Sequence, residues 1–96
     1  MREQRAHPRV PFGRDVVVDL AGREIDAVAV NVSVGGMYLE CHEAVPIGEQ
    51  ISIRCELPGL SGAVLPATVR WRKPGGFGVH FGLLGAKETH ALAEVR

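Results

Sequence analysis

Aromatic residues, cysteines and long apolar runs are scarce in this chain, and each scarcity argues against a class of protein. Only 5% of the 96 residues are aromatic, which is few for a surface that stacks on single-stranded nucleic acid. The two cysteines, Cys41 and Cys55, occupy positions suited to apolar residues and are expected to be reduced and buried. No apolar run approaches the roughly 20 residues of a membrane-spanning helix. We therefore expect one small globular domain with no membrane contact.

Net charge is absent too, because 11 basic and 11 acidic side chains cancel. A general nucleic-acid-binding protein needs a strongly basic face, so nucleic acid is not an expected partner. The N-terminus lacks the apolar segment of a signal peptide. These observations predict a cytoplasmic location.

Motifs for catalysis are missing from the sequence. It has neither a phosphate-binding loop with its Lys-Ser/Thr pair nor a G-x-S-x-G nucleophile turn. Cys41 and His42 are adjacent, but they are not expected to act as a nucleophile and its base, because neighbouring strand residues point to opposite faces. The four histidines show no metal-ligand spacing. We expect no enzyme activity, no metal and no cofactor.

The apolar residues that are present alternate with polar ones, as in β-strands. The alternating stretches cover residues 14–20, 23–32, 37–41, 50–57, 63–72 and 77–81. Six short strands at regular spacing indicate an all-β fold, a closed or nearly closed antiparallel barrel. Residues 87–95 change to Ala, Leu and Glu near helical spacing, which predicts a short C-terminal helix packed on the sheet.

The alternation also predicts which side chains face the core. In the second strand the larger apolar residues are expected inside: Val28, Val30 and Val32. The small and polar residues are expected outside: Ala27, Ala29, Asn31 and, if the strand continues, Ser33. In the fifth strand, Val69 and Trp71 are expected to share one face.

Residues 1–12 show no helical or strand period, and Pro8 and Pro11 favour an extended conformation there. We expect an arm over residues 1–12, followed by a barrel domain over residues 13–96. The arm carries a local excess of arginine. In an extended chain Arg5 and Arg9 project to the same side about 13 Å apart, where they could grip a ligand with two charged or planar groups.

A second polar stretch, residues 31–36, interrupts the apolar segments. Asn31 and Ser33 are two positions apart and can point to the same side. Gly36 removes a side chain, so that a ligand or a loop can approach the backbone. Taken alone, this stretch is typical of a turn, and the arginine pair is typical of a solvated tail.

Together, Arg5-x-x-x-Arg9 and Asn31-x-Ser33-x-x-Gly36 resemble the two motifs of the PilZ domain family. The similarity continues through residues 36–40, 67–71 and 76–81 and covers nearly the whole chain. It implies a six-stranded antiparallel β-barrel that binds cyclic di-GMP, a bacterial second messenger. Arg5 and Arg9 would contact its guanines and phosphates, while Asn31, Ser33 and Gly36 would hold a guanine and its sugar–phosphate. The family accepts Asp or Asn at the first position of the second motif.

The resemblance and the residue chemistry predict a binding module. Arginine offers forked donors that match guanine O6 and N7, and a plane that stacks on a base. The arm is expected to fold over the ligand, so that binding changes the surface presented to a downstream protein. Two alternatives stay open: an adaptor of the same fold that binds a protein partner without nucleotide, and a small barrel for single-stranded nucleic acid with Tyr38 as its best aromatic.

Overall fold

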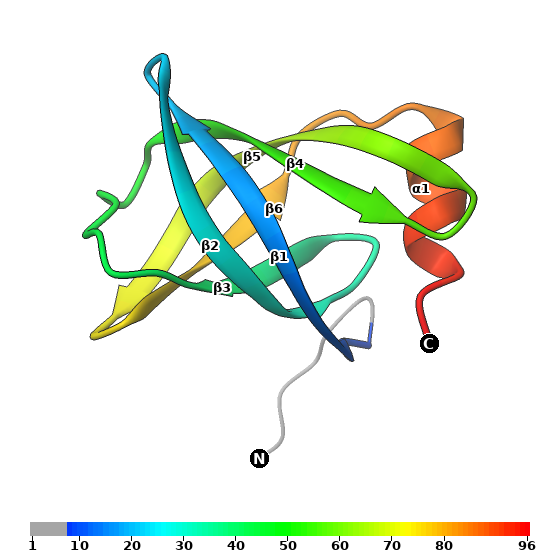
Figure 1. Cartoon of the computed structure of the whole chain (residues 1–96), viewed down its shortest axis with the longest axis horizontal. Coiled ribbons are helices and arrows are strands. Elements are labelled where there is room, and N and C mark those ends of the chain that lie inside the picture. Colours follow the sequence, from blue (N-terminus) through cyan, green and yellow to red (C-terminus); the bar gives the residue numbers. More distant parts are fainter. Residues whose placement is uncertain (1–7) are drawn as a thin grey trace.

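The strands close into a barrel. The computed structural model describes residues 8–96, in which six antiparallel strands are hydrogen-bonded in the order β1-β2-β3-β6-β5-β4 and back to β1 (Figure 1). The strands are β1 (Val10–Leu20), β2 (Arg23–Val32), β3 (Gly36–Glu40), β4 (Gln50–Leu57), β5 (Leu60–Lys73) and β6 (Gly76–Phe81). The predicted six-stranded all-β barrel is confirmed.

One short helix, α1 (Ala86–Ala93), follows β6 and packs beside β5 at one end of the barrel (Figure 1). It contributes Ala91 and Leu92 to the core. The predicted C-terminal helix is therefore present. Within the described residues, no helix is long and apolar enough to cross a membrane.

Most of the core consists of aliphatic side chains, together with one phenylalanine, from the inward faces of the strands. Among the largest fully buried side chains are Phe77, Met37, Leu39, Ile53 and Leu65. The alternation predicted for residues 50–57 agrees with this burial, and of the inward residues predicted for 77–81, Phe77 and Val79 are buried. Cys55 lies in the core and Cys41 is half-buried, and both are free thiols.

Strand β1 begins earlier than the pattern predicted. Val10 already pairs with Val32, and Pro11 with Asn31, so the last residues of the predicted arm belong to the barrel. Residues 1–7, Arg5 among them, lie outside the described residues. Arg9 directly precedes β1, which brings it to the end of β2.

The predicted inward face of β2 is wrong over most of the strand. The side chains that face the core are those of Ile25, Ala27 and Ala29. Val28, predicted inside, is 39% exposed, and Val30 is only half-buried. The apolar character of valine was therefore a poor guide to its direction here.

A β-bulge explains both the error and the part that was correct. Ala29 pairs with Leu39 and Asn31 with Tyr38, so Val30 has no partner in β3. One extra residue shifts the alternation of the strand by one position. Beyond the bulge, Val32 faces the core and Asn31 is partly exposed, as predicted.

A second β-bulge, in β5, turns Trp71 outward. Val69 pairs with Val79 and Trp71 pairs with Gly78, so Arg70 is the extra residue of β5. Val69 is buried but Trp71 is 42% exposed, and the prediction that they share a face is wrong. The bulge leaves the indole on the outer surface of the barrel.

Candidate ligand-binding site

Ser33 builds the turn between β2 and β3. Its Oγ accepts hydrogen bonds from the backbone N–H groups of Gly35 at 3.0 Å and Gly36 at 3.2 Å. The backbone N–H of Ser33 donates to the carbonyl of Gly36 at 2.9 Å. The residue is 8% exposed, and a serine in this arrangement satisfies backbone donors locally. The contacts of Ser33 in the described chain are thus those of a turn.

Gly36 is required by the close approach of two strands. It pairs with His80 of β6, and a Cβ at Gly36 would collide with the carbonyl oxygen of Val79. The same Cβ position lies 3.5 Å from Nη2 of Arg9. The missing side chain therefore admits both a neighbouring strand and the guanidinium of Arg9.

Arg9 and Asn31 join the two motifs. Nη1 of Arg9 donates a hydrogen bond to Oδ1 of Asn31 at 3.0 Å, across 22 residues of sequence. Both residues are half-buried. An aspartate would pair ionically with this arginine, whereas the asparagine accepts with its carbonyl oxygen and keeps two amide N–H donors. Of the predicted site residues, the structure thus brings Arg9, Asn31, Ser33 and Gly36 to one corner of the barrel.

An aromatic pair lies beside this corner, and sequence reasoning missed half of it. Tyr38, the register partner of Asn31, stacks on Trp71 with ring centroids 5.4 Å apart and planes 9° apart. The indole covers Gly78, where a Cβ would collide with its ring. Nζ of Lys73 lies 5.0 Å from the Tyr38 ring centroid. The outward glycine at position 78 was the available signal, because it leaves room for a large side chain from the next strand.

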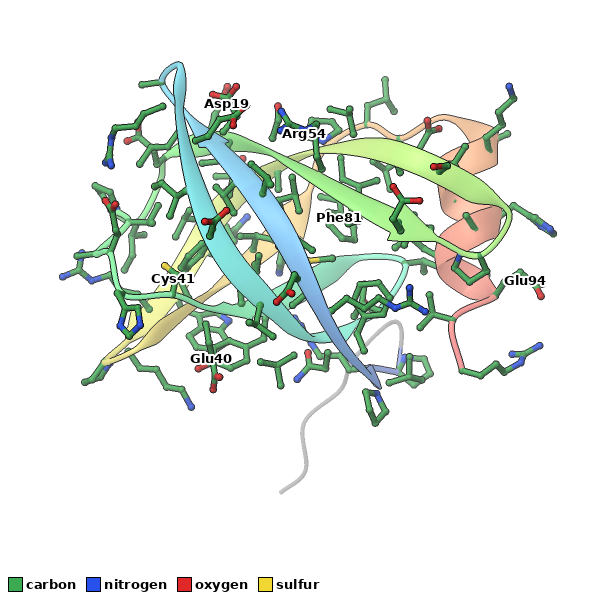
Figure 2. The ribbon with its side chains drawn as sticks, in the orientation of Figure 1. Asp19, Glu40, Cys41, Arg54, Phe81 and Glu94 are labelled. Atoms are coloured by element: carbon green, nitrogen blue, oxygen red, sulfur yellow. The ribbon has the colours of Figure 1, made fainter. Side chains whose placement is uncertain are left out.

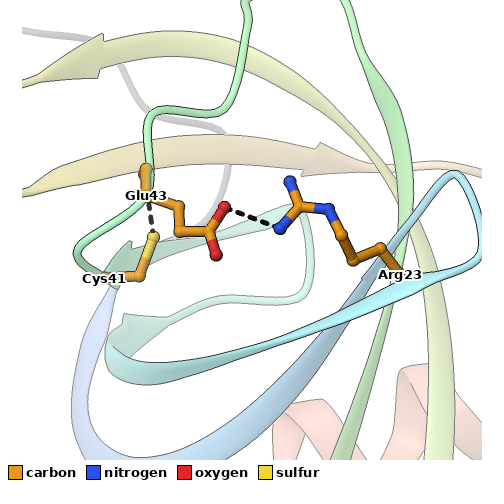
Figure 3. A network of polar contacts seen from close by, with 3 residues as sticks. All are labelled: Arg23, Cys41 and Glu43. Carbon is orange, nitrogen blue, oxygen red and sulfur yellow. Dashed lines mark hydrogen bonds and ion pairs between the residues drawn. The ribbon is translucent and has the colours of Figure 1, made fainter.

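The start of β2 carries polar contacts of a different kind. Nη1 of Arg23 and Oε1 of Glu43 form an ion pair at 2.8 Å, and the thiol of Cys41 donates to the carbonyl of Glu43 at 3.2 Å (Figure 3). These contacts hold the loop after β3 against β2.

Burial raises the pKa of the Cys55 thiol to about 11, so this cysteine stays protonated at neutral pH. Among residues 8–96, no group of three or more His, Cys, Asp or Glu side chains could hold a metal ion.

The fold is that of a small closed β-barrel domain. A family model described as the PilZ domain matches residues 3–94. The chain therefore belongs to the PilZ family, which is a family of cyclic di-GMP receptors. No curated protein matches its sequence.

Two solved structures share the fold. The Bacillus subtilis inhibitor of motility (MotI/DgrA) superposes with a TM-score of 0.74 at 20% identity, over 97% of this chain and 49% of that one. The PilZ domain of CeSA from a cellulose-synthesizing bacterium superposes with a TM-score of 0.70 at 19% identity, over 88% of this chain and 90% of that one. The chain thus spans about half the length of the motility inhibitor.

Proposed function

We propose that this domain is a receptor for cyclic di-GMP and that the nucleotide binds at the corner formed by Arg9, Asn31, Ser33 and Gly36. The observation that carries the proposal is the 3.0 Å hydrogen bond between Arg9 and Asn31. It supports the proposal because it joins Arg9 of the first motif to Asn31 of the second across 22 residues of sequence. The membership of the family supports the identity of the ligand.

The chemistry of the corner suits a guanine nucleotide. Each arginine can donate two hydrogen bonds to guanine O6 and N7, or stack its guanidinium plane on a base. The amide donors of Asn31 suit a base or phosphate oxygen. Charge-assisted hydrogen bonds contribute roughly 1.5–3 kcal/mol each. A few of them, less the cost of ordering the ligand and the chain, suffice for micromolar affinity, about −8 kcal/mol.

Arg5 enters the proposal through the sequence motif alone. It is four residues from Arg9 and would grip the second guanine or a phosphate. Binding would then draw the residues that precede β1 over the nucleotide and change the surface presented to a protein partner. The position of Arg9 supports this step, because Arg9 directly precedes β1 and Val10 already pairs with the end of β2.

Titration calorimetry with cyclic di-GMP tests the proposal. We expect micromolar binding by the wild-type chain, and about tenfold or greater weakening in Arg5→Ala, Arg9→Ala and Asn31→Ala, because each loses one or more charge-assisted contacts. Arg96→Ala, which removes an arginine from the exposed C-terminus, serves as the matched control. Emission of Trp71, the single tryptophan, gives a second readout, because its ring stacks on Tyr38, the register partner of Asn31.

Two results would contradict the proposal in different ways. Unchanged binding in both Arg5→Ala and Arg9→Ala would overturn the site. Absence of binding by the wild-type chain would overturn the nucleotide as ligand and would favour the adaptor that binds a protein without nucleotide.

A further inference from the structure

A groove of about 1110 Å³ lies on the outer face of β4, β1, β2 and β3 and reaches the turn between β5 and β6. None of the residues of the Arg9 corner lines it. Four carboxylate residues line it: Asp15, Asp26, Glu40 and Glu56. Two outward valines, Val17 and Val28, supply apolar surface between them. The groove is therefore both acidic and partly apolar.

The strand register places each valine between charged neighbours. Val28 pairs with Asp15 on one side and with Glu40 on the other. Val17 pairs with Asp26 and with Arg54. Figure 2 shows Glu40 pointing away from the barrel. A ligand on this face would meet carboxylates on both sides of an apolar contact.

Three of the carboxylates are unpaired within the part of the chain that the structure describes. The side chains of Asp15, Asp26 and Glu40 form no ion pair or hydrogen bond with residues 8–96. Carboxylates gathered on one face of a sheet repel each other. Folding therefore leaves them with a charge that this part of the chain does not neutralise.

The fourth carboxylate and the nearby cations are engaged locally. Glu56 accepts a hydrogen bond from the backbone N–H of Gly62 at 2.9 Å, and hydrogen bonds from Ser61 and Gly62 hold its pKa below its ordinary value. Arg54 pairs with Glu24 at 3.1 Å, at the edge of the groove. Lys73 lies over the Tyr38 ring. The groove thus keeps an acidic character despite the two cations that line it.

We infer that this groove is the docking surface for a segment of a partner protein in which lysine or arginine side chains flank an apolar residue. Charge complementarity selects this occupant: cations would neutralise Asp15, Asp26 and Glu40, while the apolar residue would cover Val17 and Val28. Electrostatic complementarity of this kind sets specificity and association rate at protein interfaces. The groove is distinct from the Arg9 corner because neither Arg9 nor Asn31 lines it. The inference stands whether or not the corner binds cyclic di-GMP.

Nuclear magnetic resonance of the full ¹⁵N-labelled chain tests the inference. The probe is a synthetic peptide of alternating lysine and valine, and a matched peptide has glutamate in place of lysine. We expect the lysine peptide to shift the amide signals of Val17, Val28 and Glu40 in a saturating manner, and the glutamate peptide to leave them unchanged. Absence of saturating shifts, or shifts confined to Asn31 and its neighbours, would overturn the inference.

Charge variants separate specific docking from general attraction. A triple variant, Asp15→Asn, Asp26→Asn and Glu40→Gln, should bind the lysine peptide at least tenfold more weakly. The control triple variant, Glu49→Gln, Glu88→Gln and Glu94→Gln, makes the same change in net charge elsewhere and should bind as the wild type does. An equal loss of affinity for the lysine peptide in both triple variants would overturn the inference.

Two further measurements address the apolar contact and the identity of the occupant. Val28→Ser should lower the affinity for the lysine peptide several-fold, and unchanged affinity would contradict the role of the valines. Sedimentation of the free chain should show the same mass for the wild type and the groove triple variant. Self-association that the triple variant abolishes would identify a second copy as the occupant and overturn the proposed partner.

Discussion

The two ends of the outward face of β2 differ in how their polar side chains are used. At one end, Asn31 accepts a hydrogen bond from Arg9, and Ser33 closes the adjoining turn. At the other end, the side chains of Asp26 and of Asp15 on the neighbouring strand form no hydrogen bond or ion pair with residues 8–96. The first end is held together by contacts within the chain, whereas the second presents charge to its surroundings. Changes at the first end should therefore cost stability, and changes at the second should not.

The bulge at Val30 separates these two ends. Before it, Asp26 and Val28 are exposed, and after it Asn31 reaches the outer surface. Without the extra residue the alternation would turn Asn31 inward. One irregular position thus allows a single strand to contribute to both the corner and the groove.

The largest effect is expected at Gly36. In Gly36→Ala the new methyl group would collide with the carbonyl oxygen of Val79, so β3 and β6 would have to separate. Such overpacking typically costs about 1–3 kcal/mol of unfolding free energy, measured by urea denaturation. In the control, Gly82→Ala, the nearest atom to the added Cβ is 3.7 Å away, an ordinary contact. Equal stability of the two variants would show that Gly36 is not a packing requirement.

A smaller effect is expected from the contact between Arg9 and Asn31. A double-mutant cycle with Arg9→Ala and Asn31→Ala should give a coupling energy of about 0.5–1.5 kcal/mol in urea denaturation without ligand. Asp26→Ala at the groove end should change the unfolding free energy by no more than about 0.5 kcal/mol, as for most surface positions. Zero coupling energy between Arg9 and Asn31, or a large loss of unfolding free energy in Asp26→Ala, would contradict the difference in stability between the two ends.

The smallest effect is expected at Glu56, whose carboxylate is held by Ser61 and Gly62. These hydrogen bonds lower its pKa in the folded state. The stabilisation is therefore present above the unfolded pKa and is lost as the pH falls through the folded pKa. The fall in urea midpoint between pH 7 and pH 3 should be smaller in Glu56→Gln than in the wild type. Glu94→Gln removes the same charge from the C-terminal helix, and an identical change there would assign the effect to net charge alone.

The sequence by itself determined the number of strands, the closed barrel and the C-terminal helix. Alternation is a local signal, and in β4 it matched the observed burial from end to end. In β6 it correctly placed Phe77 and Val79 in the core. The motif around Asn31 was readable for a similar reason, because Asn, Ser and Gly at that spacing combine turn chemistry with ligand donors. Arg9 was predicted from the other motif, through the resemblance to the PilZ family, and the structure places it against Asn31.

Only the tertiary structure decided which residues the corner and the groove contain. A bulge is a property of two paired strands, since its extra residue exists only relative to the partner. The bulges at Val30 and Arg70 therefore cannot be recognised in the alternation of apolar and polar residues along the sequence. They nevertheless determine that Val28 and Trp71 face outward. Gly36 looked like an open approach to the backbone, and it was the pairing of β3 with β6 that put Val79 there. The acidic groove likewise exists only because β1, β2, β3 and β4 lie side by side, which brings together carboxylates from distant parts of the sequence.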